Sequence, residues 1–131
     1  MSTDDSEAEQ LIELATKVFD LARQGEADAL AGYLDAGVPP NLTNDRGDTL
    51  LMLAAYHGHR DAVALLLVRG ADPNRANDKG QTPLAGAVFK GEDEIVGLLV
   101  TAGADPDAGT PSAREAATMF GKTELLASFD S

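Results

Sequence analysis

The stretch from Val68 to Leu84 is VRGADPNRANDKGQTPL, and its letters GADP, at 70–73, return at 103–106 within TAGADPDAGTP. The two copies lie 33 residues apart. A period of that length is typical of repeat architectures, in which each repeat is one supersecondary unit that buries its apolar face only against its neighbours. The fold therefore depends on how far the period extends.

The period covers almost the whole chain. Residues 45–77 and 78–110 agree at 13 of 33 positions without a gap. A partial copy that lacks the opening turn precedes them, and a copy with three fewer loop residues follows at 112–129. Atypical terminal repeats are expected because each must present one face to water. We therefore expect one domain at 9–131, divided into a capping repeat (9–44), two full repeats (45–77 and 78–110) and a second capping repeat (111–131). The acidic N-terminus at 1–8, which lies before the first repeat, is expected to be disordered.

Each full repeat carries the start signals of a short first helix. Thr49 and Thr82 suit the N-cap position, where a side-chain oxygen accepts a backbone N–H. Pro83 follows at the first helical position, where its missing N–H costs nothing. These signals predict inner helices that end at about Tyr56 and Phe89.

The second helix of each repeat shows both a stripe and a stop. Val63, Leu66, Leu67 and Gly70 follow the spacing i, i+3, i+4, i+7, which places apolar residues on one helix face. Gly70 and its counterpart Gly103 then predict left-handed residues just after the helix, and the prolines of GADP prevent its continuation.

These stretches resemble the ankyrin repeat family over roughly residues 14–130. GDTLLMLAAYHGH and GQTPLAGAVFKGE are similar to its GxTPLHxAAxxGH, and DAVALLLVRGADPN and DEIVGLLVTAGADPD to its EIVxLLLxxGADxN. The resemblance implies an all-α solenoid of about four stacked helix-turn-helix units with projecting β-turn or hairpin loops. Leu50 replaces the motif proline. Met52, Ala85 and Glu92 replace motif histidines, which weakens the hydrogen bonds such histidines make.

The same resemblance implies a non-catalytic module, an adaptor, scaffold or inhibitor, that binds a protein on its concave face. In the family this face is built from the turn tips and the exposed ends of the inner helices. Tyr56, Phe89 and Met119 then occupy one equivalent position in three successive units, and large aromatic side chains are typical of binding hot spots. The implied contact residues are Arg23, Gln24, Asp45, Arg46, Asp48, Tyr56, His57, Asp78, Lys79, Gln81, Phe89, Lys90, Met119 and Phe120.

The amino-acid composition limits the classes of partner that the protein is expected to bind. With 22 acidic and 10 basic residues the formal charge is −12, which disfavours nucleic acid and anionic membranes and favours a partner with a basic patch. The absence of cysteine excludes disulfides and thiolate chemistry. No cationic start with an apolar run and no stretch of about 18 apolar residues is present, so we expect a cytoplasmic, monomeric protein without cofactors.

Three motifs invite a chemical interpretation. Gly121, Lys122 and Thr123 match the tail of a phosphate-binding loop, but no strand precedes them and the first glycine is missing. His57 and His59 form a pair that carboxylates would have to complete into a metal site. The acids at 92–94 suit a helix N-terminus better than acid–base catalysis. An enzyme with an unrecognised acidic site stays as the alternative function.

Overall fold

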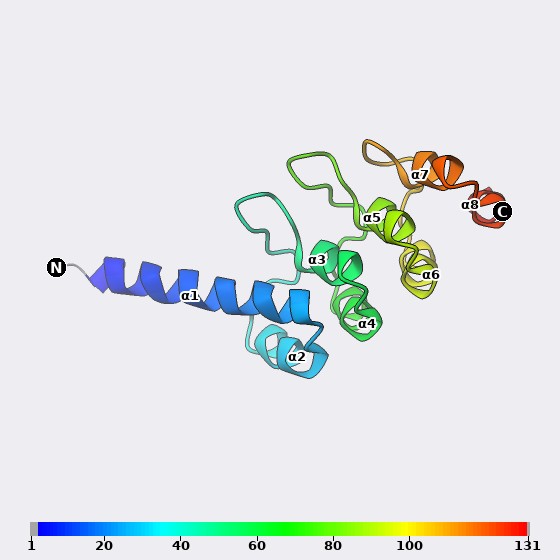
Figure 1. The fold of residues 1–131 in the computed structure, drawn as a ribbon. Coiled ribbons are helices and arrows are strands. Elements are labelled where there is room, and N and C mark those ends of the chain that lie inside the picture. Colours follow the sequence, from blue (N-terminus) through cyan, green and yellow to red (C-terminus); the bar gives the residue numbers. More distant parts are fainter. Residues whose placement is uncertain (1–2, 131) are drawn as a thin grey trace.

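The computed structural model describes residues 3–130, and these residues form eight α-helices arranged as four consecutive pairs (Figure 1). The pairs follow one another along a curved row in the order of the sequence, with the two chain ends at opposite ends of the row. Within residues 3–130 no strand forms, and the one β-bridge joins Thr43 to Thr49. The helices are α1 (Thr3–Gln24), α2 (Ala27–Asp35), α3 (Leu50–Tyr56), α4 (Arg60–Val68), α5 (Pro83–Lys90), α6 (Asp93–Thr101), α7 (Ala113–Met119) and α8 (Thr123–Phe129).

The helices form an inner and an outer layer. The inner helices α1, α3, α5 and α7 contact one another in sequence order, while α2, α4 and α6 form the outer row. The loops between α2 and α3, α4 and α5, and α6 and α7 all project from the same side of the row (Figure 1). The predicted all-α solenoid with projecting loops is therefore confirmed.

The start signals of the inner helices act as predicted. The Thr49 hydroxyl accepts the backbone N–H of Met52 at 3.0 Å, and the Thr82 hydroxyl accepts that of Ala85 at 3.2 Å. Pro83 is the first residue of α5. Helix α3 ends at the predicted position, and α5 continues to Lys90, one residue beyond the prediction.

The GADP motif ends the outer helices α4 and α6 and also connects neighbouring repeats. Gly70 and Gly103 have the predicted positive φ, 92° and 95°. Asn74, which follows the first GADP, donates to the Gly103 carbonyl at 3.1 Å and accepts the Asp105 N–H at 2.6 Å. Asn41 makes the same pair of bonds to the first GADP loop. The motif recurs because each copy both stops a helix and receives an asparagine from the preceding repeat.

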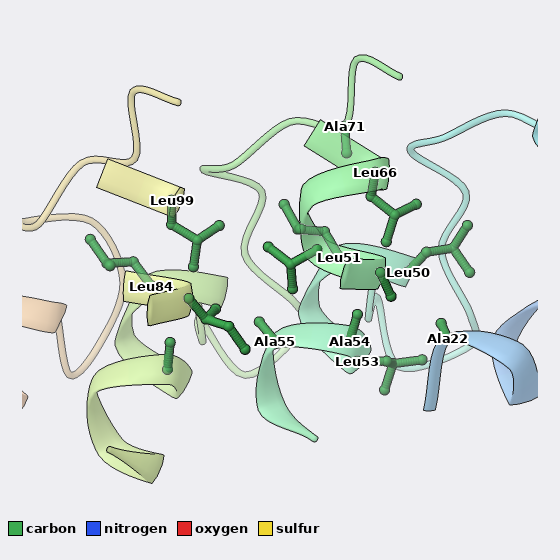
Figure 2. Packing of buried hydrophobic residues seen from close by; sticks show 14 of the residues in the cluster. Ala22, Leu50, Leu51, Leu53, Ala54, Ala55, Leu66, Ala71, Leu84 and Leu99 are labelled. Carbon is green, nitrogen blue, oxygen red and sulfur yellow. The ribbon is translucent and has the colours of Figure 1, made fainter. Parts of the chain in front are cut away.

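Leucine side chains between the inner and outer helices form a large part of the core, together with buried valine, isoleucine, phenylalanine and alanine (Figure 2). Each of these leucines removes apolar surface from water, worth about 1.5–3 kcal/mol per side chain. Ala54 and Ala55 are fully buried beside them, and such small residues let neighbouring inner helices approach closely. The leucines with at most 1 % exposure are Leu30, Leu50, Leu51, Leu66, Leu84 and Leu99.

The N-terminal expectation is corrected by the length of α1. Residues 3–8, expected to be disordered, form the first turns of this 22-residue helix, and residues 1 and 2 lie outside the described part. Glutamate, alanine and glutamine between Glu7 and Gln10 have high helix propensity, so they extend a helix whose second half is anchored by buried Val18 and Phe19. For the rest of the chain we propose the repeat boundaries at 44, 77 and 110.

Candidate functional site

The ends of the inner helices lie on the surface at equivalent places in successive repeats. Tyr56 is the last residue of α3 and Met119 the last of α7, while Phe89 is the penultimate residue of α5. Their exposed fractions are 45 %, 67 % and 56 %, respectively. The expected row of large apolar side chains is thus accessible to a partner.

Neighbouring repeats also contact one another through this row. The Phe89 ring packs edge-on against Phe120, with ring centroids 5.3 Å apart. The Lys90 ammonium lies 4.9 Å from the centre of the Tyr56 ring, within range of a cation–π interaction. These contacts orient the side chains while leaving Phe120 48 % exposed.

The hairpin tips form a second row beside the helix ends. The Asp78 N–H donates to the Arg46 carbonyl at 3.0 Å, which joins the tips of two successive hairpins. Asp48 is half-buried because its carboxylate accepts the Asn77 side-chain amide at 2.8 Å. Asp48 therefore contributes to hairpin structure, whereas the other predicted tip residues, Asp45, Arg46, Asp78, Lys79 and Gln81, are exposed.

Between the two rows the surface contains a groove made of two adjoining hollows. Met52, Tyr56 and Gln81 line both of them. The first, which we call the apolar hollow, is completed by Ala85, Gly86, Phe89 and Pro111. The second, which we call the polar hollow, is completed by Arg23, Arg46, Asp48, Leu53, His57 and Asn77.

The structure divides the predicted contact residues into two sets. Seven of them line the groove: Arg23, Arg46, Asp48, Tyr56, His57, Gln81 and Phe89. The other seven line neither hollow: Gln24, Asp45, Asp78, Lys79, Lys90, Met119 and Phe120.

Six groove residues were absent from the prediction, namely Met52, Leu53, Asn77, Ala85, Gly86 and Pro111. Met52 and Ala85 are the residues that replace the motif histidine in the two full repeats. A departure from the repeat motif at one equivalent position was therefore the available signal. Pro111 belongs to the next repeat, and no local pattern places it beside α5.

Basic side chains surround His57, which lines the polar hollow. The His59 Nε2 lies 2.6 Å from the Arg23 carbonyl oxygen, so its N–H donates and ties α1 to the second repeat. The pKa of His57 is lowered, first by partial burial and then by the nearby His59, Arg23 and Lys90. Apart from burial, each group that lowers the pKa of His57 is a basic side chain.

The motifs that suggested chemistry have structural partners. Lys122 precedes the seven-residue α8, and its ammonium lies 3.8 Å from Asp93. Glu94 pairs with Arg60 of the preceding repeat at 2.7 Å, whereas Asp93 faces Lys122 of the following repeat. Within residues 3–130 no group of three histidine, aspartate or glutamate side chains is arranged to hold a metal ion. None of the helices described there is long and apolar enough to cross a bilayer.

Comparisons with known proteins agree with this architecture. A family model for ankyrin repeats, in three copies, matches residues 18–110. An ankyrin repeat protein of Pseudomonas aeruginosa, PA3287, is 56 % identical over 45 residues, which are 34 % of this chain and 26 % of that protein. The crystal structure of the human ASB11 ankyrin repeat domain matches 68 % of this chain and 40 % of that chain, with a TM-score of 0.65 and 31 % identity. The chain thus covers less than half the length of each.

Proposed function

The chain belongs to the ankyrin repeat family, whose members are generally protein–protein interaction modules, and on that premise we propose that it is a non-catalytic adaptor, scaffold or inhibitor that binds a protein on its concave face. One observation carries the proposal. Tyr56 and Phe89, exposed at equivalent positions of adjacent repeats, flank an apolar hollow in that face.

The degree of exposure distinguishes binding residues from core residues. A tyrosine or phenylalanine buries its ring when its role is packing, whereas about half of each of these two side chains stays accessible. A single exposed aromatic residue carries little weight, but two on the rim of one hollow resemble the anchors that dominate interface energies. The inner-helix ends are therefore the proposed centre of the contact.

The proposed partner is a protein that meets a monomer of this chain in the cytoplasm, and neither nucleic acid nor a membrane is proposed. The net charge of −12 supports a partner with a basic patch, because opposite charges accelerate encounter at long range. Added salt should then slow association more than it speeds dissociation.

The test is to remove both aromatic anchors. A partner captured from the native lysate and identified by mass spectrometry is titrated calorimetrically against the parent and against Tyr56→Ala with Phe89→Ala. Hot-spot residues predict a loss of about 2–4 kcal/mol of binding free energy with little change in melting temperature, since both side chains are largely exposed.

Val68→Ala is the control, because Val68 is an apolar residue on the outer helix α4 that is 83 % exposed. It should leave the affinity unchanged. Equal affinities of the double variant and the parent would move the binding site off the concave face. A collapse in stability of the double variant would show that the aromatic residues belong to the core.

A further inference from the structure

We propose that the segment of the partner that enters the groove carries a bulky aliphatic side chain next to a carboxylate. The inference rests on the proposed function and specifies the ligand chemistry of the same site. The apolar hollow receives the aliphatic side chain, and the cations beside it receive the carboxylate.

The shape and lining of the apolar hollow determine the first half of this ligand. Apart from the Tyr56 hydroxyl, Gln81 carries the one polar side-chain group of the lining. Ala85 and Gly86 leave room in the apolar hollow because one has a small side chain and the other has none. A Cβ atom added at Gly86 would lie 3.8 Å from the Tyr56 ring, in the space that glycine leaves open. A small polar side chain would lose its hydration here without gaining partners, whereas an aliphatic side chain gains contacts.

The basic side chains around the hollow determine the second half. Arg23 and Arg46 line the polar hollow, while Lys90 lies against the Tyr56 ring that borders both hollows. Asp48 is the one carboxylate in that lining, and it already accepts the Asn77 amide. Arg23 already pairs with Asp20 at 2.9 Å, so the cations left to an incoming carboxylate are Arg46 in the polar hollow and Lys90 beside it.

Cations without a salt bridge lie on this surface, and Lys17 and Arg75 elsewhere are also without one among residues 3–130. Among the described residues, Arg46, Lys79 and Lys90 form no salt bridge although the chain has 22 acidic residues. Arginines on the outer helices and in the last repeat do pair with acids: Arg60 with Asp61 and Glu94, Arg69 with Asp35, and Arg114 with Asp107 and Asp130. The concave face thus holds cations that are available to an incoming carboxylate.

The lowered pKa of His57 supports a positive potential at this place. After burial, its causes are His59, Arg23 and Lys90, and no carboxylate is among them. Charges farther away than about 8 Å are largely screened at physiological salt, so distant acidic residues do not cancel the charges of Arg46 and Lys90. The overall charge governs encounter, and the local charge governs which segment binds.

Geometry places the two determinants close together. The Lys90 ammonium lies 4.9 Å from the centre of the Tyr56 ring, at the border of the apolar hollow. An extended peptide advances about 3.3 Å per residue. The carboxylate therefore lies within about two residues of the aliphatic anchor.

The test uses phage-displayed random dodecapeptides selected on the full chain, followed by fluorescence anisotropy with the selected peptide carrying fluorescein. Two charge-reversal pairs lower the net charge by the same amount: Arg46→Glu with Lys90→Glu in the site, and Lys17→Glu with Arg75→Glu away from it. None of these four residues forms a salt bridge among residues 3–130. Circular dichroism checks that each variant is folded.

The parent and the distant pair should both select leucine, isoleucine or methionine within two residues of aspartate or glutamate. The site pair should bind the selected peptide about tenfold more weakly or worse, since two ion pairs become repulsive. Enrichment of lysine or arginine, equal binding by the site pair, or no enrichment at all would overturn the inference.

The same peptides separate this inference from the proposed function. If selected peptides lack acidic residues but bind Tyr56→Ala with Phe89→Ala more weakly than the parent, the inferred ligand chemistry is wrong and the proposal of binding on the concave face is supported. If they bind that double variant as tightly as the parent, the concave face itself is wrong.

Discussion

The two glycines of the α6 region allow a direct test of the repeat interpretation. Gly97 lies inside α6, and Gly103 follows the end of that helix with φ 95°. At either position an added Cβ would lie within 4 Å of no atom beyond the adjoining residues and the helix's own backbone, so backbone conformation determines the effect of a substitution. The same change, glycine to alanine, should therefore have opposite signs at two positions six residues apart.

The magnitudes follow from the backbone. Alanine at positive φ costs about 1–2 kcal/mol, whereas alanine inside a helix gains about 0.5–1 kcal/mol over glycine. Gly103→Ala and Gly97→Ala should thus differ by about 1.5–3 kcal/mol in unfolding free energy. Gly103→Val should be destabilised by about 2–3 kcal/mol, because a β-branched residue tolerates this region poorly.

Urea denaturation followed by circular dichroism measures these differences as shifts of the midpoint. With a slope of about 1–3 kcal/mol per molar urea, the two alanine variants should be separated by about 1 M. A Gly103→Ala or Gly103→Val variant as stable as the parent would refute the helix-stop role of GADP. A destabilised Gly97→Ala variant would refute the claim that backbone conformation alone decides.

Two further predictions concern a cap and a histidine. Thr82→Ala should lower the free energy of unfolding by about 1 kcal/mol, because it removes the acceptor of the Ala85 N–H. Thr82→Ser should retain most of the stability. Equal urea midpoints for the alanine and serine variants would contradict the cap. The lowered pKa of His57 means that the unfolded chain binds a proton first as the pH falls below about 6.5. The free energy of unfolding should therefore decrease from pH 7.5 towards pH 5.5. His57→Gln should reduce that decrease, as measured by urea titrations at the two pH values. An identical pH dependence in parent and variant would show that His57 does not contribute to it.

The sequence alone was sufficient for the helix caps and helix stops, which short-range interactions decide. A threonine before an apolar run caps a helix through a residue three positions away, and a glycine after one ends it through its own φ; both act within one repeat. The 33-residue period then predicted that equivalent residues, such as Tyr56 and Phe89, lie at equivalent places. The error at residues 3–8 arose because composition there is compatible with both a solvated coil and the extension of an anchored helix.

Only the tertiary structure decided which surface residues line the groove. The apolar hollow combines side chains from α3 and α5 with Gln81 from one loop and Pro111 from the next, so its existence depends on the stacking distance between repeats. Tertiary structure also decides how the charges are distributed. The composition predicts an acidic molecule, but which arginines and lysines stay without a salt bridge depends on which acids lie close to each of them. Stacking sets those distances, and no local pattern in the sequence encodes them.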